Sequence, residues 1–226
     1  MKHAKTHLMN RILVISPHPD DESIGCGGTL RKHITEGDSV WVIFLTSGER
    51  GGHGMSPEET KRVREEEAKA AAIILGYEHL EFWNIPNGKL EITLNVVEQL
   101  REKVESWKPH FIYVTHDNEM HPEHKAAAGI VREAIKNNAG FEIEPIVFMY
   151  EVWTPLQDMD HIVDITPYVD IKRKAIQAHK CQCAVMDFDE AILGLNRYRG
   201  EMHSWPGGPY AEVFMKMRSG SAILTV

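Results

Sequence analysis

The sequence contains two short clusters of histidines and carboxylates, and each follows an apolar run. The apolar runs occupy 12–15 and 111–114. Histidine nitrogens and carboxylate oxygens are common ligands of Zn2+ and of other divalent ions. These residue types at the ends of two apolar runs therefore predict a metal site. The clusters are His18-Pro19-Asp20-Asp21-Glu22 and His121-Pro122-Glu123-His124.

The spacing within the clusters indicates which residue does what. His18 and Asp21 are three residues apart across a proline-stiffened turn, so both can reach one ion while Asp20 is free to act as a base. The proline after His121 suits the first position of a helix, which makes His121 the N-cap and places His124 in the first turn. His18, Asp21 and His124 then form a ligand set with open positions, typical of a catalytic site. The set suits Zn2+ and non-haem Fe2+ alike, so it leaves the metal open.

The elements that must position these clusters alternate along the chain. The run at 12–15 shows no polar alternation, as expected for a strand buried on both faces. Strand-like and helix-like segments alternate from there to about residue 152, which predicts an α/β fold with a single-domain, doubly wound, mostly parallel, Rossmann-like sheet. The predicted strands are 11–16, 40–45, 79–84, 110–115 and 146–152, and the predicted helices are 22–36, one between Ser56 and Gly76, 93–107, 121–138 and 168–180.

The order of the strands decides where the clusters lie. In the common order 3-2-1-4-5, strands 1 and 4 are neighbours, and ligands bind in the crevice at their carboxyl ends. The two clusters occupy those two loops, so we expect the site at the carboxyl ends of strands 1 and 4. We expect one domain over residues 1–226, with an α/β core at about 11–152 and a cap at about 153–226 that completes the site.

Composition limits the other classes of function. The chain has 226 residues, of which 42% are hydrophobic, and a net charge of −8 at pH 7. Nucleic-acid phosphates select for basic surfaces, so we expect no nucleic-acid partner. No run of about 20 apolar residues is present, so we expect no membrane span. The N-terminus lacks an apolar signal-peptide core and the three cysteines form no even framework, which favours the cytoplasm.

The two clusters resemble the LmbE/PIG-L family of metal-dependent N-acetylglucosaminyl deacetylases. The His-Pro-Asp-Asp-Glu motif is the most specific part of a resemblance that runs through nearly the whole chain. Two positions depart from the family's pattern: Glu123 lies where Asp is more often found, and Asn87 lies at a sugar-contacting position often held by Asp before a glycine. The weaker matches are Thr46-Ser47-Gly48-Glu49, Arg64-Glu65-Glu66-Glu67-Ala68, Tyr150-Glu151-Val152-Trp153 and Ala211-Glu212-Val213-Phe214.

The resemblance implies a hydrolase that removes the acetyl group from an N-acetylglucosamine-containing conjugate and releases acetate and a free amine. It implies Zn2+ as the cofactor, with Fe2+ or another divalent ion as the alternative, held by His18, Asp21 and His124. The metal would activate a water molecule and polarise the acetyl carbonyl. Asp20 would act as the general base, and His121, as an imidazolium, would stabilise the oxyanion.

Other residues are expected to support this centre. A cation is disfavoured at a helix N-terminus, so a carboxylate must offset the charge of His121, and Asp117 and Glu123 are the nearest candidates. Arg64 or Glu67 could reach the site from the helix that carries them.

Substrate contacts are predicted on two loops. The glycine-rich loop 48–55 follows the second strand, and we expect it to gate or contact the sugar through Glu49 and Arg50. Asn87 is expected to contact the sugar from the next loop. We expect a small amino-sugar substrate as the partner, and a homo-oligomer.

Two rival functions stay open on this evidence. One is an amidase of the same mechanism that cleaves another amide, such as a thiol conjugate. The other is a non-catalytic metal- or nucleotide-binding module, which Asp20 and His121 argue against because metal binding requires neither. The segment Gly25-Cys26-Gly27-Gly28 lacks the spacing of a dinucleotide-binding loop, so close helix packing is the favoured explanation of its glycines.

Overall fold

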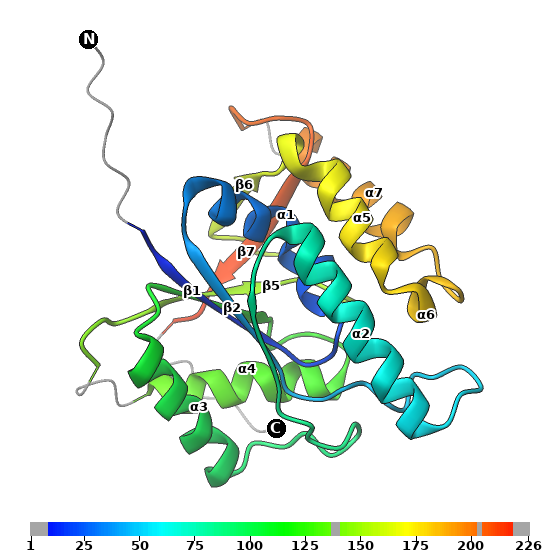
Figure 1. Cartoon of the computed structure of the whole chain (residues 1–226). Helices are drawn as coiled ribbons and strands as arrows, with labels where there is room; N and C mark the ends of the chain where they lie inside the picture. Colours follow the sequence, from blue (N-terminus) through cyan, green and yellow to red (C-terminus); the bar gives the residue numbers. More distant parts are fainter. Residues whose placement is uncertain (1–8, 137–140, 203–204, 219–226) are drawn as a thin grey trace.

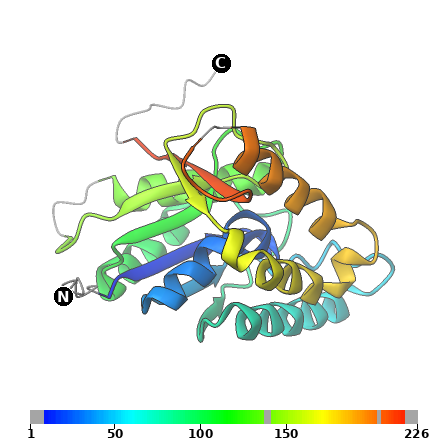
Figure 2. The same ribbon diagram turned by 90° about the horizontal axis from the view of Figure 1, so that it is seen from above.

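The protein is a three-layer α/β structure with one sheet between two layers of helices. The computed structural model describes residues 9–136, 141–202 and 205–218. Figures 1 and 2 show α3 and α4 on one face of the sheet and α1, α2, α5 and α7 on the other. The helices are α1 (Asp21–Glu36), α2 (Pro57–Leu75), α3 (Leu94–Trp107), α4 (Pro122–Ile135), α5 (Val169–Ala178), α6 (Lys180–Cys183) and α7 (Phe188–Met202).

The sheet has seven strands in the order β3-β2-β1-β4-β5-β7-β6. The strands β1 to β5 are parallel, which confirms the predicted doubly wound fold and its 3-2-1-4-5 order. The last two strands are antiparallel: β7 pairs with β5, and β6 pairs with β7. The strands are β1 (Arg11–Ser16), β2 (Ser39–Phe44), β3 (His79–Phe82), β4 (Phe111–Thr115), β5 (Ile146–Tyr150), β6 (His161–Asp164) and β7 (Ala211–Lys216).

The chain after residue 153 builds more of the fold than a cap would. It adds β6 and β7 to the sheet and α5 and α7 to one helical layer. The sequence pattern did not predict these strands for two reasons. The strand β6 is a four-residue edge strand, and β7 contains two charged residues, the buried Glu212 and the exposed Lys216.

The central strand β1 is buried on both faces, as its unbroken apolar run predicts. Ile12 and Val14 belong to the core cluster under α1, α2 and α5, whereas Leu13 and Ile15 belong to the cluster under α3 and α4. All four side chains have 0% exposure. The strand therefore holds the two helical layers at fixed positions on either side of it.

Local signals in the sequence set the helix ends. Ser56 caps α2 by accepting a hydrogen bond from the Glu59 amide, and Gly76 ends the helix with a φ of 93°. Of the predicted helix 121–138, residues up to Ile135 are helical, and 137–138 lie outside the described residues.

The glycines early in α1 allow close packing and so confirm the packing interpretation. A Cβ at Gly25 would lie 2.1 Å from the Tyr150 ring, and one at Gly28 would lie 2.7 Å from Ile165. Side chains at these positions would push the helix away from the sheet.

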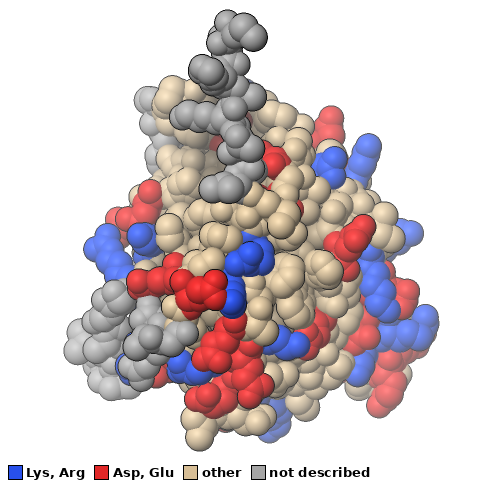
Figure 3. Space-filling model, turned by 60° about the vertical axis from the view of Figure 1, so that its left-hand side comes forward, with Lys and Arg blue, Asp and Glu red and all other residues tan. Residues whose placement is uncertain are grey.

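The surface in Figure 3 carries charges of both signs. No helix within the described ranges is long and apolar enough to cross a membrane. On the face in Figure 3, Lys and Arg side chains lie among Asp and Glu and do not form a continuous basic surface. Residues 1–8, which contributed to the prediction of localisation, lie outside the described residues.

A buried ion pair ties β7 to α1 and α5. Lys172 Nζ on α5 lies 2.6 Å from Glu212 Oε1, and both side chains are at most 1% exposed. The Glu212 carboxylate also accepts hydrogen bonds from the amides of Gly28 (2.9 Å) and Thr29 (2.7 Å) in α1. The last strand is thus joined to two helices of one layer through a single carboxylate.

Removing the cation of this pair should destabilise the fold. Lys172→Met leaves the Glu212 charge buried without its counter-ion, so the free energy of unfolding should fall by about 3–5 kcal/mol in urea denaturation. Lys174→Met on the exposed side of α5 is the matched control and should change it by less than ~0.5 kcal/mol. Equal small losses in both variants would show that the buried pair is not a structural link.

Candidate active site

The two clusters meet because their strands are neighbours. The strands β1 and β4 pair in parallel, with Ile15 opposite Val114, so the loops that follow them leave the same edge of the sheet. His18 lies in the first loop, Asp21 begins α1, and His124 lies in the first turn of α4. Residues about a hundred positions apart in the sequence therefore share one site.

Three donor atoms converge at this edge. His18 Nδ1 lies 3.2 Å from Asp21 Oδ2, and His124 Nε2 lies 3.3 Å from each of these two atoms. A tetrahedral ion with ligand bonds of ~2.0–2.1 Å separates its donor atoms by ~3.3–3.4 Å. The triangle therefore has the size that a tetrahedral ion requires, with one corner left for another ligand. These residues fit a bound Zn2+ or a similar divalent ion.

The charges around the triangle favour a cation at its centre. Burial opposes protonation of His124, but Asp21 and Glu119 outweigh it and raise the pKa of His124 to about 10. Burial also opposes ionisation of Asp21, yet His124 and His18 hold the pKa of Asp21 well below its usual range. The same field that retains a proton between these groups would attract a metal ion, which displaces that proton on binding.

The Glu123 carboxylate contacts the His18 ring, whereas the sequence suggested it as a partner of His121. Its Oε2 lies 2.8 Å from His18 Nε2, and its Oε1 accepts hydrogen bonds from the amides of Gly88 (2.7 Å) and Leu90 (3.2 Å). A carboxylate on the outer nitrogen of a ligand histidine fixes the tautomer that leaves the inner nitrogen free for metal. The longer side chain of Glu123 spans the gap to the 87–90 loop, which the sequence could not reveal.

His121 caps α4 as predicted. Its Nδ1 accepts a hydrogen bond from the Glu123 amide at 3.2 Å, a contact that favours a neutral ring with no proton on this nitrogen. Burial, together with His18 and His124, lowers the pKa of His121. Both observations favour the neutral ring over the expected imidazolium. Asp117, the other carboxylate considered as a partner of His121, pairs instead with Arg132.

Asp20 is held in the crevice by an unusual backbone and by Arg64. Its φ of 133° is rare for a residue with a side chain and stores strain. Arg64 Nη2 lies 3.0 Å from Asp20 Oδ2, and Glu22 accepts the Asp20 amide at 3.3 Å. Burial raises the pKa of Asp20 to about 6, although Arg64 opposes this. A strained, buried carboxylate that faces the metal triangle is suited to proton transfer.

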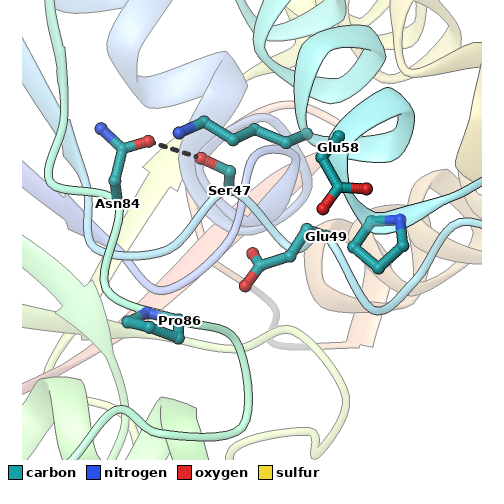
Figure 4. A pocket seen from close by; sticks show the side chains of 7 residues that line it. Ser47, Glu49, Glu58, Asn84 and Pro86 are labelled. Carbon is teal, nitrogen blue, oxygen red and sulfur yellow. Dashed lines mark hydrogen bonds between the residues drawn. The ribbon is translucent and has the colours of Figure 1, made fainter.

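The predicted substrate residues occupy two linked loops. The Asn87 amide group donates to Glu123 Oε2 (2.5 Å), and its oxygen accepts from the Arg50 amide (3.3 Å). Glu49 accepts the Asn87 backbone amide at 2.6 Å and lines a second pocket with Ser47 and Glu58 (Figure 4). The loop from Gly48 is thus tied to the loop of Asn87.

Of Asn87, Glu49 and Arg50, the structure places one in the pocket of the donor triangle. Asn87 lines the metal pocket, whereas Glu49 lines the neighbouring one and the exposed Arg50 side chain packs near Gly88. Since the polar atoms of Asn87 already have protein partners, its contact with a sugar stays a prediction.

Two members of the donor triangle, His18 and Asp21, line a pocket of about 170 Å³. His18, Asp20 and Asp21 form its polar floor, and the wall combines polar and apolar side chains. The wall includes Ile24, Val152, Trp153 and Phe188.

The sequence did not single out Glu119, and it suggested Arg64 as one of two residues that could reach the site. Arg64, which was considered from its helix, does reach Asp20, whereas Glu67 accepts the Cys181 amide instead. Glu119 was not singled out, yet its carboxylate lies behind His124, with Oε2 3.7 Å from His124 Nδ1. Its position five residues before a ligand histidine was the only available signal.

The comparison with known families agrees with this geometry. A profile of the family described as PIG-L, GlcNAc-PI de-N-acetylase, matches residues 13–135, a segment that contains both clusters and more than half of the chain. The chain belongs to this family. The resemblance inferred from the motifs is therefore confirmed.

Relatives of this chain are named for two kinds of reaction. This chain is 28% identical over 193 residues to diacetylchitobiose deacetylase of Thermococcus kodakarensis, and the match covers 77% of this chain and 70% of the relative. It is 29% identical over 184 residues to a probable N-acetyl-alpha-D-glucosaminyl L-malate deacetylase 2 of Bacillus anthracis, covering 76% and 81%. The crystal structure of 4-carboxy-2-hydroxymuconate hydratase from Pseudomonas putida has a TM-score of 0.81 at 27% identity, covering 93% and 97%.

The donor triangle predicts how metal binding depends on single residues. The purified protein should bind one divalent ion per chain, and Ala at His18, Asp21 or His124 should lower its affinity in a competition titration with a chelating dye. The exposed His53→Asn is the control and should bind as tightly as the unchanged protein. Because the ligands are carried by a separately packed sheet, the metal-free protein should keep its circular-dichroism spectrum. Unchanged affinity in all three Ala variants would remove the ligand assignment.

Proposed function

We propose that this PIG-L-family protein is a metal-dependent N-deacetylase that acts on a conjugate containing N-acetylglucosamine and releases acetate and a free amine. One observation carries the proposal: Asp20 is held beside a triangle of metal donors, and His18, Asp20 and Asp21 all line one pocket. The names of the relatives support the substrate class, because two of them are deacetylases of N-acetylated sugars. Zn2+ is the proposed ion.

The residues of the site divide the hydrolysis between them. A divalent ion held by His18, Asp21 and His124 supplies Lewis-acid activation of water and of the amide carbonyl. Asp20 accepts the proton of the attacking water as the new carbon–oxygen bond forms. His121 is placed to donate a hydrogen bond from Nε2 to the developing oxyanion, because its Nδ1 is occupied as an acceptor. Asp20 then returns the proton to the nitrogen as the carbon–nitrogen bond breaks.

The neutral state of His121 suits this role. A ring nitrogen of His121 lies within 4.8 Å of ring nitrogens of both His18 and His124, so the ring borders the space beside the metal donors. A neutral N–H donor needs no counter-charge at the helix N-terminus, where a cation would be disfavoured. The side chain therefore stabilises negative charge without disturbing the metal ligands.

The pocket wall suits a sugar ring. Trp153 is 42% exposed and packs edge-on against Phe188, with ring centroids 5.6 Å apart. An exposed, immobilised indole offers an apolar face to the C–H groups of a pyranose or to the acetyl methyl group. We propose that Trp153 and Phe188 orient the acetylated sugar and that Asn87 contacts it, while Arg50 and Glu49 act through their hydrogen bonds to Asn87. A homo-oligomer and a cytoplasmic location stay predictions.

A hydratase is the second candidate, because a relative of the same fold carries that name. Both reactions require a water molecule and a base, so the metal and Asp20 suit either. The substrates differ in kind: an uncharged acetamide on a sugar, or an unsaturated acid with several carboxylates. Such an acid requires cationic partners, whereas Arg64, the one Lys or Arg that lines the pocket in the described part of the chain, is already paired with Asp20. The site therefore favours the amide substrate.

A substrate panel separates the two candidates. Acetate release should be measured by an enzyme-coupled assay on N-acetylglucosamine conjugates with different aglycones, with and without a chelator. We expect metal-dependent release from at least one conjugate and no hydration of unsaturated dicarboxylates, which ultraviolet absorbance reports. The reverse pattern would assign the protein to the hydratases.

The two adjacent aspartates should respond differently to the same substitution. Asp20→Asn keeps the shape but removes the basic oxygen, so it should retain the metal and lose ~10²-fold or more in kcat with little change in KM. Asp21→Asn removes a charged ligand and should lose metal affinity. Metal content and kinetics should be measured on the same preparations.

Each of the two Asp→Asn variants serves as a control for the other. Both substitutions remove one negative charge from the same loop, so a non-specific effect of charge would change metal affinity equally in the two. An Asp20→Asn enzyme with bound metal and near-full activity would show that another group, with His121 first in line, is the base.

A further inference from the structure

Glu119 lies behind the metal triangle and contacts two parts of the site at once. It is 0% exposed and belongs to the loop between β4 and α4. One carboxylate oxygen, Oε2, lies 3.7 Å from His124 Nδ1, and neither atom has another hydrogen-bond partner among the described residues. A shift of less than ~1 Å would give this pair a normal hydrogen-bond distance. The outer nitrogen of His124 therefore has one available acceptor.

The other oxygen of Glu119 holds the pocket wall. Oε1 accepts three consecutive backbone amides, those of Val152 (2.9 Å), Trp153 (2.8 Å) and Thr154 (3.1 Å). Val152 and Trp153 line the pocket. Three amides that converge on one buried oxygen fix the course of this short segment, residues 152–154, which follows β5. The position of the Trp153 indole depends on that course.

These contacts place His124 and the wall on the two oxygens of one carboxylate. We propose that Glu119 is a positioning residue that links the metal-bound ring of His124 to segment 152–154, so that metal binding and an ordered wall stabilise each other. The inference rests on the proposed metal site and not on the identity of the substrate. Coupling of this kind is reciprocal: whatever Glu119 adds to metal affinity, metal must add to the order of the wall.

The chemistry of the ligand explains the direction of the effect. When His124 binds metal through Nε2, its Nδ1 carries a proton and becomes a donor, for which Glu119 Oε2 is the acceptor. That hydrogen bond holds the carboxylate in place and so keeps Oε1 under the three amides. Without metal nothing fixes Nε2, so the ring and the carboxylate keep the 3.7 Å separation, at which this hydrogen bond is not made.

Two substitutions separate the two ends of the link. Glu119→Gln keeps an oxygen for the three amides but presents no carboxylate to His124, whereas Glu119→Ala removes both contacts. Asp117→Asn is the matched control, because Asp117 lies in the same loop and pairs with Arg132 away from the pocket. Each variant changes the charge of the loop by the same amount.

The experiment has two readouts that need no substrate. Zn2+ affinity is measured by competition with a chelating dye, and hydrogen exchange of the amides of 152–154 is measured by mass spectrometry with and without Zn2+. In the unchanged protein and in Asp117→Asn, Zn2+ should slow this exchange several-fold. Glu119→Gln should bind Zn2+ ~10–100-fold more weakly, a typical loss for such outer contacts, keep the metal-free protection and lose the effect of Zn2+ on it. Glu119→Ala should also lose the protection itself.

The outcomes distinguish this inference from the proposed function. If Zn2+ binds the unchanged protein but leaves exchange at 152–154 unaltered, or if Glu119→Gln binds Zn2+ normally, Glu119 is not the link and the deacetylase proposal is untouched. If the unchanged protein binds no divalent ion, the proposed metal site fails and the link fails with it. Should Glu119→Ala not fold, Glu119→Gln alone still gives both readouts.

Discussion

The parallel pairing of β1 with β4 is the constraint on which the rest of the site depends. Those two strands carry residues that are about a hundred positions apart in the sequence to the same edge of the sheet, and the nitrogens of His18 and His124 lie 3.3 Å apart as a result. The pairing is held by apolar packing on both faces, with Leu13 and Ile15 under one helical layer and Ile12 and Val14 under the other. Buried apolar area thus supplies much of the free energy that brings these side chains together.

The parts of the structure that follow local rules could be predicted from the sequence. The unbroken apolar run of β1, the cap at Ser56 and the proline after His121 each determine an element within a few residues, and all three are present. The partners of buried charges could not be predicted in this way. Glu123 faces His18 because one extra methylene group and the path of the 87–90 loop bring them together, and neither is visible in a pattern of residue types.

The two positions that depart from the family's usual residues turn out to be in contact. Asn87 donates to Glu123, so an amide meets a carboxylate where two acidic side chains would repel each other. The sequence showed each departure separately, and only the fold shows that they form one hydrogen bond. Substitutions at such a pair are not independent, and their effects on stability are not expected to add.

The backbone of Asp20 has a consequence for the stability of the whole protein. A φ of 133° costs a residue with a side chain on the order of 1–3 kcal/mol, whereas glycine adopts it freely. Net folding free energies of domains are only about 5–15 kcal/mol, so this one dihedral angle is a substantial fraction of the total. A chain selected for folding alone would have glycine at position 20. With Asp20 in its proposed role as the base, a search for stabilising substitutions at this position would find one that removes the reactive group.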